Sequence, residues 1–226
     1  MRDAHSDSKP WPPRTDDDYR QEAVIILGEE LADRLARVRL MIFDADGVLT
    51  PGNLIYSSEG EAIKEFHSHD GFGLVMGRLA GIKRAVLTGR NSGIVGRRCR
   101  ELRFDSIKLG RFDKVAALRE ILAETGCKAE ETLYVGDDLI DLPAMFAVAV
   151  PVAVPAAPVE VRQNSCYVTT TSGGQGAVRE IIDLVLKSSG LYTLALERLL
   201  DKAWHPTQKE LSSDAGQPGE RGKMDS

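Results

Sequence analysis

Residues 39–50 read RLMIFDADGVLT, and this stretch predicts the fold of the chain. Its apolar run LMIF, with Arg39 before it and aspartate and glycine after it, predicts a short strand buried on both faces. Asp44 and Asp46 follow at the carboxyl end of that strand, the edge where ligands bind in an open parallel sheet. Aspartate and glycine also favour turns, so the motif alone leaves a functional and a turn-forming interpretation open.

Composition limits the class of protein. With 226 residues, of which 42% are hydrophobic, the chain can bury one good core, so a single domain is expected. A formal net charge of -5 argues against sequence-independent binding of nucleic acid and suits a site that holds a divalent cation. Three scattered cysteines and the lack of a visible secretory signal indicate a reducing, cytoplasmic location.

The ends of the chain differ from its middle. Residues 1–19 and 205–226 are polar, and we predict that they form a disordered N-terminal arm and C-terminal tail around one domain at 20–204. Residues 142–159 carry no charge, but prolines divide them into a short helix, a short strand and a turn. We therefore expect this segment to be buried core, and we expect no membrane contact.

Between these ends, strands and helices alternate in the way that builds a parallel sheet. The predicted strands are 39–43, 83–87, 106–109, 132–135, 150–154 and 166–170. The predicted helices are 21–38, 71–80, 92–102, 114–126, a helix from residue 139, and 177–190. Two short runs at 53–57 and 62–66 predict a β-hairpin that projects from the sheet. The expected fold is a three-layer α/β/α, doubly wound parallel sheet with a β-hairpin insertion.

Informative polar residues follow successive predicted strands. They are Thr88, Gly89 and Arg90, then Lys114 at the start of a helix, and then Asp137, Asp138 and Asp141. Taken separately, such residues are more often a turn, a solvated charge and a helix N-cap. Because four loops bring them to one edge of the sheet in this order, the sequence predicts a functional site there.

These residue types suit phosphoryl transfer, which needs a nucleophile, a cation, donors for phosphate oxygens and an acid for the leaving oxygen. Asp44 and Asp137 are placed to share a hard, oxygen-preferring cation, and Mg²⁺ is the ion we expect. Asp46 can donate a proton to the leaving alcohol. The groups that can hold phosphate oxygens are Thr88, the Gly89 N–H and Lys114.

On these motifs, the sequence resembles the haloacid dehalogenase superfamily of phosphatases over residues 38–187. The matching motifs are DADGV at 44–48, Thr88, Lys114 and GDDLID at 136–141. The resemblance implies an aspartyl-phosphate mechanism, in which Asp44 is the nucleophile and Asp46 the acid and base. It also implies Mg²⁺ held by Asp44, the Asp46 carbonyl and Asp137, with Asp138 and Asp141 supporting the metal site.

A narrower resemblance is carried by residues 46–74, 87–92, 134–145 and 173–186. These stretches look like the 3-deoxy-D-manno-octulosonate 8-phosphate phosphatases, which implies a homotetramer that hydrolyses a phosphorylated eight-carbon sugar acid made on the way to lipopolysaccharide. His69 and Gln175 stand where the bacterial enzymes usually carry arginine, so a nine-carbon sugar acid remains an alternative.

The same resemblance implies that Lys64 and Arg90 contact an anion, although Lys64 on the hairpin can equally be a solvated charge. His69 is a further candidate substrate contact or a surface residue. The cations of the next helix, Arg97, Arg98 and Arg100, are assigned to its solvated face.

Two further expectations concern the class and the assembly of the protein. Receiver domains also carry a phosphorylated aspartate, and a non-catalytic domain can keep this fold. Here the predicted nucleophile comes first along the chain and the acidic cluster last, which favours a phosphatase.

Neither the interval from Asp44 to Thr88 nor that from Thr88 to Lys114 has room for a cap domain. The apolar hairpin at 53–66 is therefore expected to pack against its copies in a homotetramer and so to close the site.

Overall fold

The structure is a computed structural model that describes residues 12–200. At its centre lies a six-stranded sheet in the order β5-β4-β1-β6-β7-β8, in which every neighbouring pair is parallel. The predicted doubly wound α/β fold is therefore confirmed. The strands are β1 (Leu40–Phe43), β4 (Lys83–Leu87), β5 (Ser106–Lys108), β6 (Thr132–Gly136), β7 (Val150–Ala153) and β8 (Tyr167–Val168).

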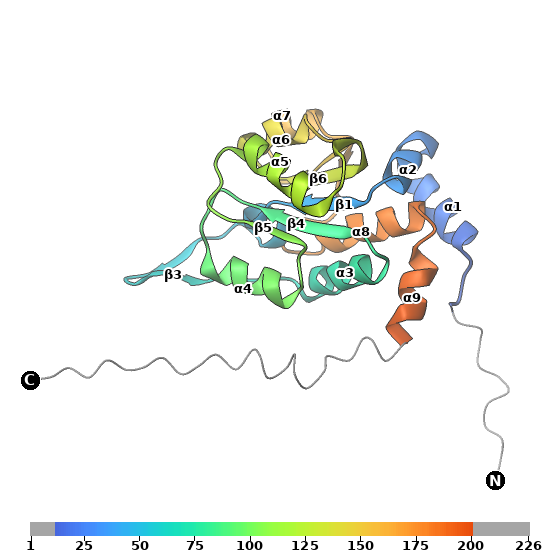
Figure 1. The fold of residues 1–226 in the computed structure, drawn as a ribbon, viewed down its shortest axis with the longest axis horizontal. Helices are drawn as coiled ribbons and strands as arrows, with labels where there is room; N and C mark the ends of the chain where they lie inside the picture. Colours follow the sequence, from blue (N-terminus) through green and yellow to red (C-terminus); the bar gives the residue numbers. More distant parts are fainter. Residues whose placement is uncertain (1–11, 201–226) are drawn as a thin grey trace, which may run out of the picture.

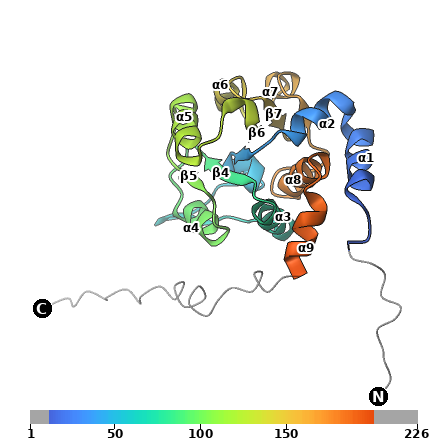
Figure 2. The same cartoon turned by 45° about the vertical axis from the view of Figure 1, so that its right-hand side comes forward.

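Helices cover both faces of this sheet (Figures 1 and 2). One face carries α3 (Ser68–Leu79), α4 (Gly93–Glu101) and α8 (Ala177–Ser188). The other face carries α5 (Lys114–Thr125), α6 (Leu142–Met145) and α7 (Val159–Gln163). The remaining helices pack against α8 and α3, and they are α1 (Asp16–Leu27), α2 (Glu29–Ala36) and α9 (Tyr192–Leu200).

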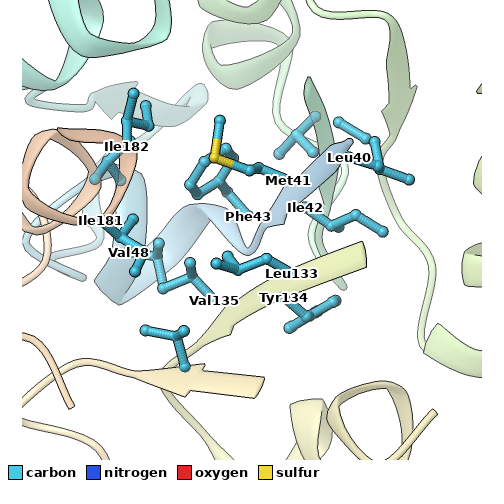
Figure 3. Packing of buried hydrophobic residues seen from close by; sticks show 14 of the residues in the cluster. Leu40, Met41, Ile42, Phe43, Val48, Leu133, Tyr134, Val135, Ile181 and Ile182 are labelled. Atoms are coloured by element: carbon cyan, nitrogen blue, oxygen red, sulfur yellow. The ribbon is translucent and has the colours of Figure 1, made fainter. Parts of the chain in front are cut away.

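Strand β1 lies in the middle of the hydrophobic core. All four of its residues are fully buried, as expected for a strand covered on both faces. Met41 and Phe43 lie on the side that faces Ile182 of α8, whereas Leu40 and Ile42 point to the opposite side (Figure 3). The loop that follows β1 therefore starts from a rigid position.

The strand order reverses at β1, because β4 and β5 lie on one side of it and β6 to β8 lie on the other. In open α/β sheets, such a reversal leaves a crevice at the carboxyl ends of the two central strands, and ligands bind there. Here those strands are β1 and β6, which are followed by Asp44 and Asp137. The topology thus brings the first and the last predicted motifs together.

The predicted hairpin is present as β2 (Ile55–Ser57) and β3 (Gly60–Ile63), an antiparallel pair that projects from the sheet (Figure 1). Three large apolar side chains on it are exposed, namely Ile55 at 47%, Tyr56 at 59% and Ile63 at 58%. Besides this hairpin, the described chain between β1 and Lys114 holds a short helical turn at 45–49, α3, β4, α4 and β5. That part of the chain therefore contains no cap domain.

Some predicted boundaries were wrong. Residues 21–38 form parts of two helices, because Gly28, at φ 76° and ψ 161°, ends α1 and precedes α2. Helix α1 begins at Asp16, inside the predicted arm, where Thr15 and Asp18 form a reciprocal capping box. Residues 139–141 form a 3₁₀ turn before α6, strand 166–170 shortens to β8, and α7 and α9 were not predicted.

Residues 1–11 of the predicted arm and the predicted tail at 205–226 lie outside the described residues. The charge-free segment 142–159 forms α6, β7 and the first residue of α7. Val150, Val152 and Ala153 are fully buried, but Phe146 is 64% and Val159 47% exposed, so the expectation that the whole segment is buried was wrong for its α6–β7 loop and for its end. No helix in residues 12–200 combines the length and the hydropathy that a membrane crossing requires.

Candidate active site

Asp44 is held at the end of β1 by the sheet itself. Its N–H donates to the carbonyl oxygen of Val135 at 3.0 Å, so the ladder with β6 continues one residue beyond the strand. The chain then turns through residues 45–49, where Gly47 has a φ of 83°. A Cβ on Gly47 would lie 2.0 Å from Asp137 Oδ2, so this approach to Asp137 requires glycine.

Two more glycines support that turn from outside. A Cβ on Gly173 would lie 1.6 Å from the carbonyl oxygen of Gly47, and one on Gly174 would lie 2.3 Å from the nitrogen of Pro51. The Gly174 N–H donates to Val48 O at 2.9 Å. In the sequence, these two glycines contribute only to the family resemblance. Two successive glycines before a helix could have indicated that two backbones meet there without side chains between them.

Lys114 is the first residue of α5 and is only 2% exposed. Its Nζ lies 2.5 Å from Asp141 Oδ1 and 3.2 Å from Asp44 Oδ1. Burial lowers the pKa of Lys114, but the negative charges of Asp44 and Asp141 together outweigh burial, so its net pKa is raised. Lys114 therefore stays cationic beside Asp44.

Asp141 is a buried acceptor that holds several groups of the site through hydrogen bonds. It is fully buried, and besides Lys114 its Oδ1 accepts from the hydroxyl of Tyr134 at 2.7 Å. Its Oδ2 accepts from the N–H groups of Asp137 and Asp138, at 3.0 and 3.2 Å. Asp141 thus fixes both the lysine and the turn that carries Asp137.

Asp44, Asp137 and Asp141 form an acidic cluster in which one oxygen of each lies within 4.8 Å of the others. Burial, and after it repulsion between the carboxylates, raises the pKa of both Asp44 and Asp137 above the ordinary aspartate value. Asp44 Oδ1 is buried and makes no hydrogen bond, because Lys114 approaches it outside hydrogen-bond geometry. An oxygen without a hydrogen bond and crowded negative charges are properties that a divalent, oxygen-preferring cation would satisfy.

The residues present therefore fit a divalent cation, but the three carboxylates do not contribute equally. Asp141 already accepts four hydrogen bonds. Asp44 and Asp137 are the members with oxygen atoms available to an ion, which agrees with the pair selected from the sequence. Asp141 instead holds Lys114 and the turn that carries Asp137 in place.

A cavity of about 440 Å³ opens above these groups. The predicted site residues on its wall are Asp44, Asp46, Thr88, Gly89, Arg90, Lys114, Asp137 and Asp138. Three exposed apolar side chains, Leu54, Phe112 and Ile140, also line it. None of these three was predicted as a site residue, because Leu54 and Phe112 lie in loops and Ile140 in a single 3₁₀ turn, where no periodic pattern marks them.

Asp46 lies on the turn after β1 and is held from two sides. Lys64, which follows β3, donates to its Oδ1, and Arg90 Nε lies 3.4 Å from its Oδ2. The Lys64 side chain is 0% exposed, so the alternative that it is a solvated hairpin charge is wrong. Both predicted anion contacts thus face a carboxylate of the chain itself.

Four candidates from the sequence do not line the cavity. Lys64 and Asp141 lie behind its wall, paired with Asp46 and Lys114, whereas His69 and Gln175 are exposed elsewhere. His69 is exposed on the first turn of α3, with its ring centroid 5.1 Å from that of His67. Gln175 is exposed in the loop before α8. Neither residue is among those that line the cavity within this single chain.

The assignment of all three α4 arginines to a solvated face was wrong for Arg98. The Arg97 side chain is 72% exposed and Arg100 is also exposed. The Arg98 side chain is only 31% exposed, and its guanidinium lies 5.9 Å from the ring centroid of Phe66. Arg98 therefore packs against the segment that leads from the hairpin into α3.

The cavity combines groups that suit transfer of a phosphoryl group. At its base lies a buried carboxylate oxygen of Asp44 without a hydrogen bond, next to the ammonium group of Lys114. A second carboxylate, Asp46, lies on the same wall two residues further along. A nucleophile, a fixed positive charge and a separate proton donor or acceptor are the parts that such a reaction uses.

Comparison with known proteins agrees with this geometry. Residues 106–182 match the family model of haloacid dehalogenase-like hydrolases. The 3-deoxy-D-manno-octulosonate 8-phosphate phosphatase KdsC of Haemophilus influenzae is 42% identical over 160 residues, 71% of this chain and 89% of that protein. The protein of the same name from Escherichia coli is 38% identical, covering 72% and 88%.

Solved structures give the same family. The phosphatase of that name from Moraxella catarrhalis, in complex with magnesium, phosphate and KDO, has a TM-score of 0.70 and 38% identity, covering 72% of this chain and 94% of that one. A cobalt-bound form from Haemophilus influenzae has a TM-score of 0.69 and 40% identity, covering 76% and 97%. The chain therefore belongs to the haloacid dehalogenase-like hydrolases, in the family of the KdsC phosphatases.

Proposed function

We propose that this chain hydrolyses 3-deoxy-D-manno-octulosonate 8-phosphate, a sugar-acid phosphate monoester, through an aspartyl phosphate on Asp44. The observation that carries the proposal is the buried Asp44 oxygen without a hydrogen bond at the base of a cavity that also presents Lys114 and Asp46. The substrate is proposed from the relatives of this chain, which cover most of the described domain.

In the first step, an Asp44 oxygen attacks phosphorus, the ester P–O bond breaks, and Asp46 gives its proton to the leaving sugar oxygen. In the second step, Asp46 takes a proton from water, the water oxygen attacks phosphorus, and phosphate leaves with regeneration of the Asp44 carboxylate. Lys114, the Thr88 hydroxyl and the Gly89 N–H hold the phosphoryl oxygens. Each of these groups lines the cavity.

We propose Mg²⁺ as the cation, held by Asp44, Asp137 and the carbonyl oxygen of Asp46, with Asp138 and Asp141 supporting this arrangement. When bound, the ion supplies positive charge against the phosphoryl oxygens and the acidic cluster. Excess chelator is expected to abolish activity, and Mg²⁺ to restore it. Full activity in chelator would overturn this part of the proposal.

The test of the substrate is a screen in which released phosphate is measured. Eight-carbon and nine-carbon sugar-acid phosphates are compared with simple sugar phosphates at equal concentration. We expect the eight-carbon compound to give the highest kcat/KM. A preference for the nine-carbon compound would instead support the alternative raised by His69 and Gln175, while no hydrolysis of any ester would favour a non-catalytic, phospho-accepting domain.

We further propose a homotetramer in a reducing, cytoplasmic setting. The exposed apolar residues Ile55, Tyr56 and Ile63 of the hairpin offer a surface for copies of the chain, and the cavity has no cap above it in residues 12–200. The three cysteines are free. Light scattering with kinetics on the same sample is the test, since a fully active monomer would contradict a shared site.

A further inference from the structure

Lys64 is unusual because it comes from the exposed hairpin and yet its side chain is completely buried. Its ammonium group lies between two carboxylates, donating to Asp46 Oδ1 and lying 3.1 Å from Glu61 Oε1. A buried ammonium is retained in such a place only when its charge is paired. Glu61 and Asp46 together provide that pairing.

Glu61 is in turn fixed to the body of the domain. The hydroxyl of Ser92 donates to Glu61 Oε2. Ser92 Oγ also accepts the N–H of Val95 at 3.2 Å, which makes Ser92 the N-cap of α4. Ser92 is 3% exposed, so this junction is sheltered from water. The second strand of the hairpin is therefore tied to the start of α4 through Glu61.

The other oxygen of Asp46 is reached from the first strand of the hairpin. Arg90 Nε lies 3.4 Å from Asp46 Oδ2, and its Nη1 donates to the hydroxyl of Tyr56 on β2 at 3.3 Å. Each carboxylate oxygen of Asp46 thus faces a cation, Lys64 on one side and Arg90 on the other. The hairpin contacts both of these cations. Such pairing from two directions restricts the rotation of the Asp46 side chain.

We infer that Glu61 and Ser92 are positioning residues for proton transfer, which hold Lys64 and through it the carboxylate of Asp46. The inference rests on the proposed function in one respect, namely the role of Asp46 as acid and base. A group that transfers a proton must lie within hydrogen-bond reach of the leaving oxygen, and its supporting contacts keep it there. The hairpin is then part of the proton-transfer apparatus.

The test uses the full chain with Mg²⁺ and two phosphate esters, 4-nitrophenyl phosphate and an alkyl phosphate such as a hexose 6-phosphate. The first has a leaving group that needs no proton, and the second has one that does. Glu61→Ala is expected to lower kcat for the alkyl ester about 10-fold to 100-fold, and kcat for the nitrophenyl ester less than about 3-fold. Glu61→Gln keeps an oxygen acceptor and is expected to restore part of the loss.

The matched control is Glu59→Ala, which removes an exposed carboxylate from the turn of the same hairpin and should leave both rates unchanged. Ser92→Ala provides a second route to the same result if Glu61→Ala does not fold, because it frees Glu61 without changing its charge. Circular dichroism shows whether each variant is folded.

An equal loss with both esters would overturn the inference, since a merely structural role lowers every rate alike. Unchanged hydrolysis of the alkyl ester in folded Glu61→Ala and Ser92→Ala would overturn it as well. The two proposals fail separately: a wild type that cleaves both esters but not the eight-carbon sugar acid loses the proposed substrate, while the leaving-group comparison still decides the role of Glu61.

Discussion

The two halves of the active site are built in different ways. Asp44 and Lys114 belong to the sheet-edge half, where each functional group is buried and starts directly at a strand or helix end. Asp46 and Arg90 belong to the hairpin half, where their side chains are 19% and 48% exposed. Asp46 pairs with Lys64 at the end of the projecting ribbon, and Arg90 donates a hydrogen bond to Tyr56 on it. The core fixes the first half, and a marginally stable hairpin holds the second.

This difference predicts where substitutions are costly. Removing one member of a buried ion pair leaves an unpaired charge, which costs about 3–5 kcal/mol, whereas exposed pairs contribute about 0–1 kcal/mol. Removing a buried partner from the sheet-edge half is therefore expected to cost stability as well as activity, except at Asp44, whose charge is disfavoured by burial. Variants of the hairpin half are expected to lower the rates for esters whose leaving group needs a proton, while the domain stays folded.

The largest effect is expected for Asp44→Asn. An amide is a poor nucleophile and a poor metal ligand, so phosphate release should fall to the background rate for every ester. The metal-free variant should unfold at the same or a higher temperature, because the raised pKa of Asp44 shows that burial disfavours its charge. If the purified variant, with its mass verified, still released phosphate above the background rate, Asp44 could not be the nucleophile.

Asp141→Ala is the strongest test of the buried half as a structural unit. It leaves Lys114 with one carboxylate partner and deprives the Tyr134 hydroxyl and two backbone N–H groups of their acceptor. We expect a loss of about 3–5 kcal/mol in the free energy of unfolding, measured by urea denaturation. Asp138→Ala, on an exposed position of the same loop, is the control, and an equal cost for both would contradict the comparison.

Asp46→Asn tests the hairpin half directly. It leaves the proposed nucleophile in place but removes the proposed proton donor and later base, which should lower the rate for alkyl phosphates about 10²-fold. A good leaving group should restore much of that loss, whereas no leaving group should rescue Asp44→Asn. Steady-state kinetics with 4-nitrophenyl phosphate and an alkyl phosphate distinguish the two variants. Equal losses of rate with both esters in both variants would contradict the proposed difference between the two halves.

The sequence allowed more of one half to be predicted than of the other. The residues Asp44, Thr88, Lys114 and Asp137 could be placed because strand ends of a parallel sheet share one edge, so chain order alone indicates their proximity. Lys64 could be named from a resemblance, but its burial could not. That burial depends on how Glu61 meets Ser92, a contact between a hairpin and a helix start for which no local pattern exists.

The pH dependence of the free energy of unfolding is expected to come from the buried carboxylates of the sheet-edge half. The pKa of both Asp44 and Asp137 is raised, so the folded protein binds these protons more tightly than the unfolded chain. In the absence of metal, stability should therefore fall by about 1–3 kcal/mol as pH rises above the ordinary aspartate pKa of about 3.9 toward the raised values. Saturating Mg²⁺ should flatten this slope in thermal melts, and Asp137→Asn should reduce it. A metal-independent slope would show that the acidic cluster is not its source.

The smallest expected effect concerns the attachment of the hairpin to the domain. Arg98 packs its guanidinium over Phe66, just after the hairpin, whereas Arg97 faces water and only pairs with Glu101 at 3.0 Å. Arg98→Ala should cost about 1 kcal/mol, because it removes both the contact with the ring and the packing of the long aliphatic stem. Arg97→Ala should cost no more than about 0.5 kcal/mol, as is usual for an exposed helical pair. Urea midpoints at equal m-values resolve the two, and identical values would mean that α4 does not anchor the hairpin through Arg98.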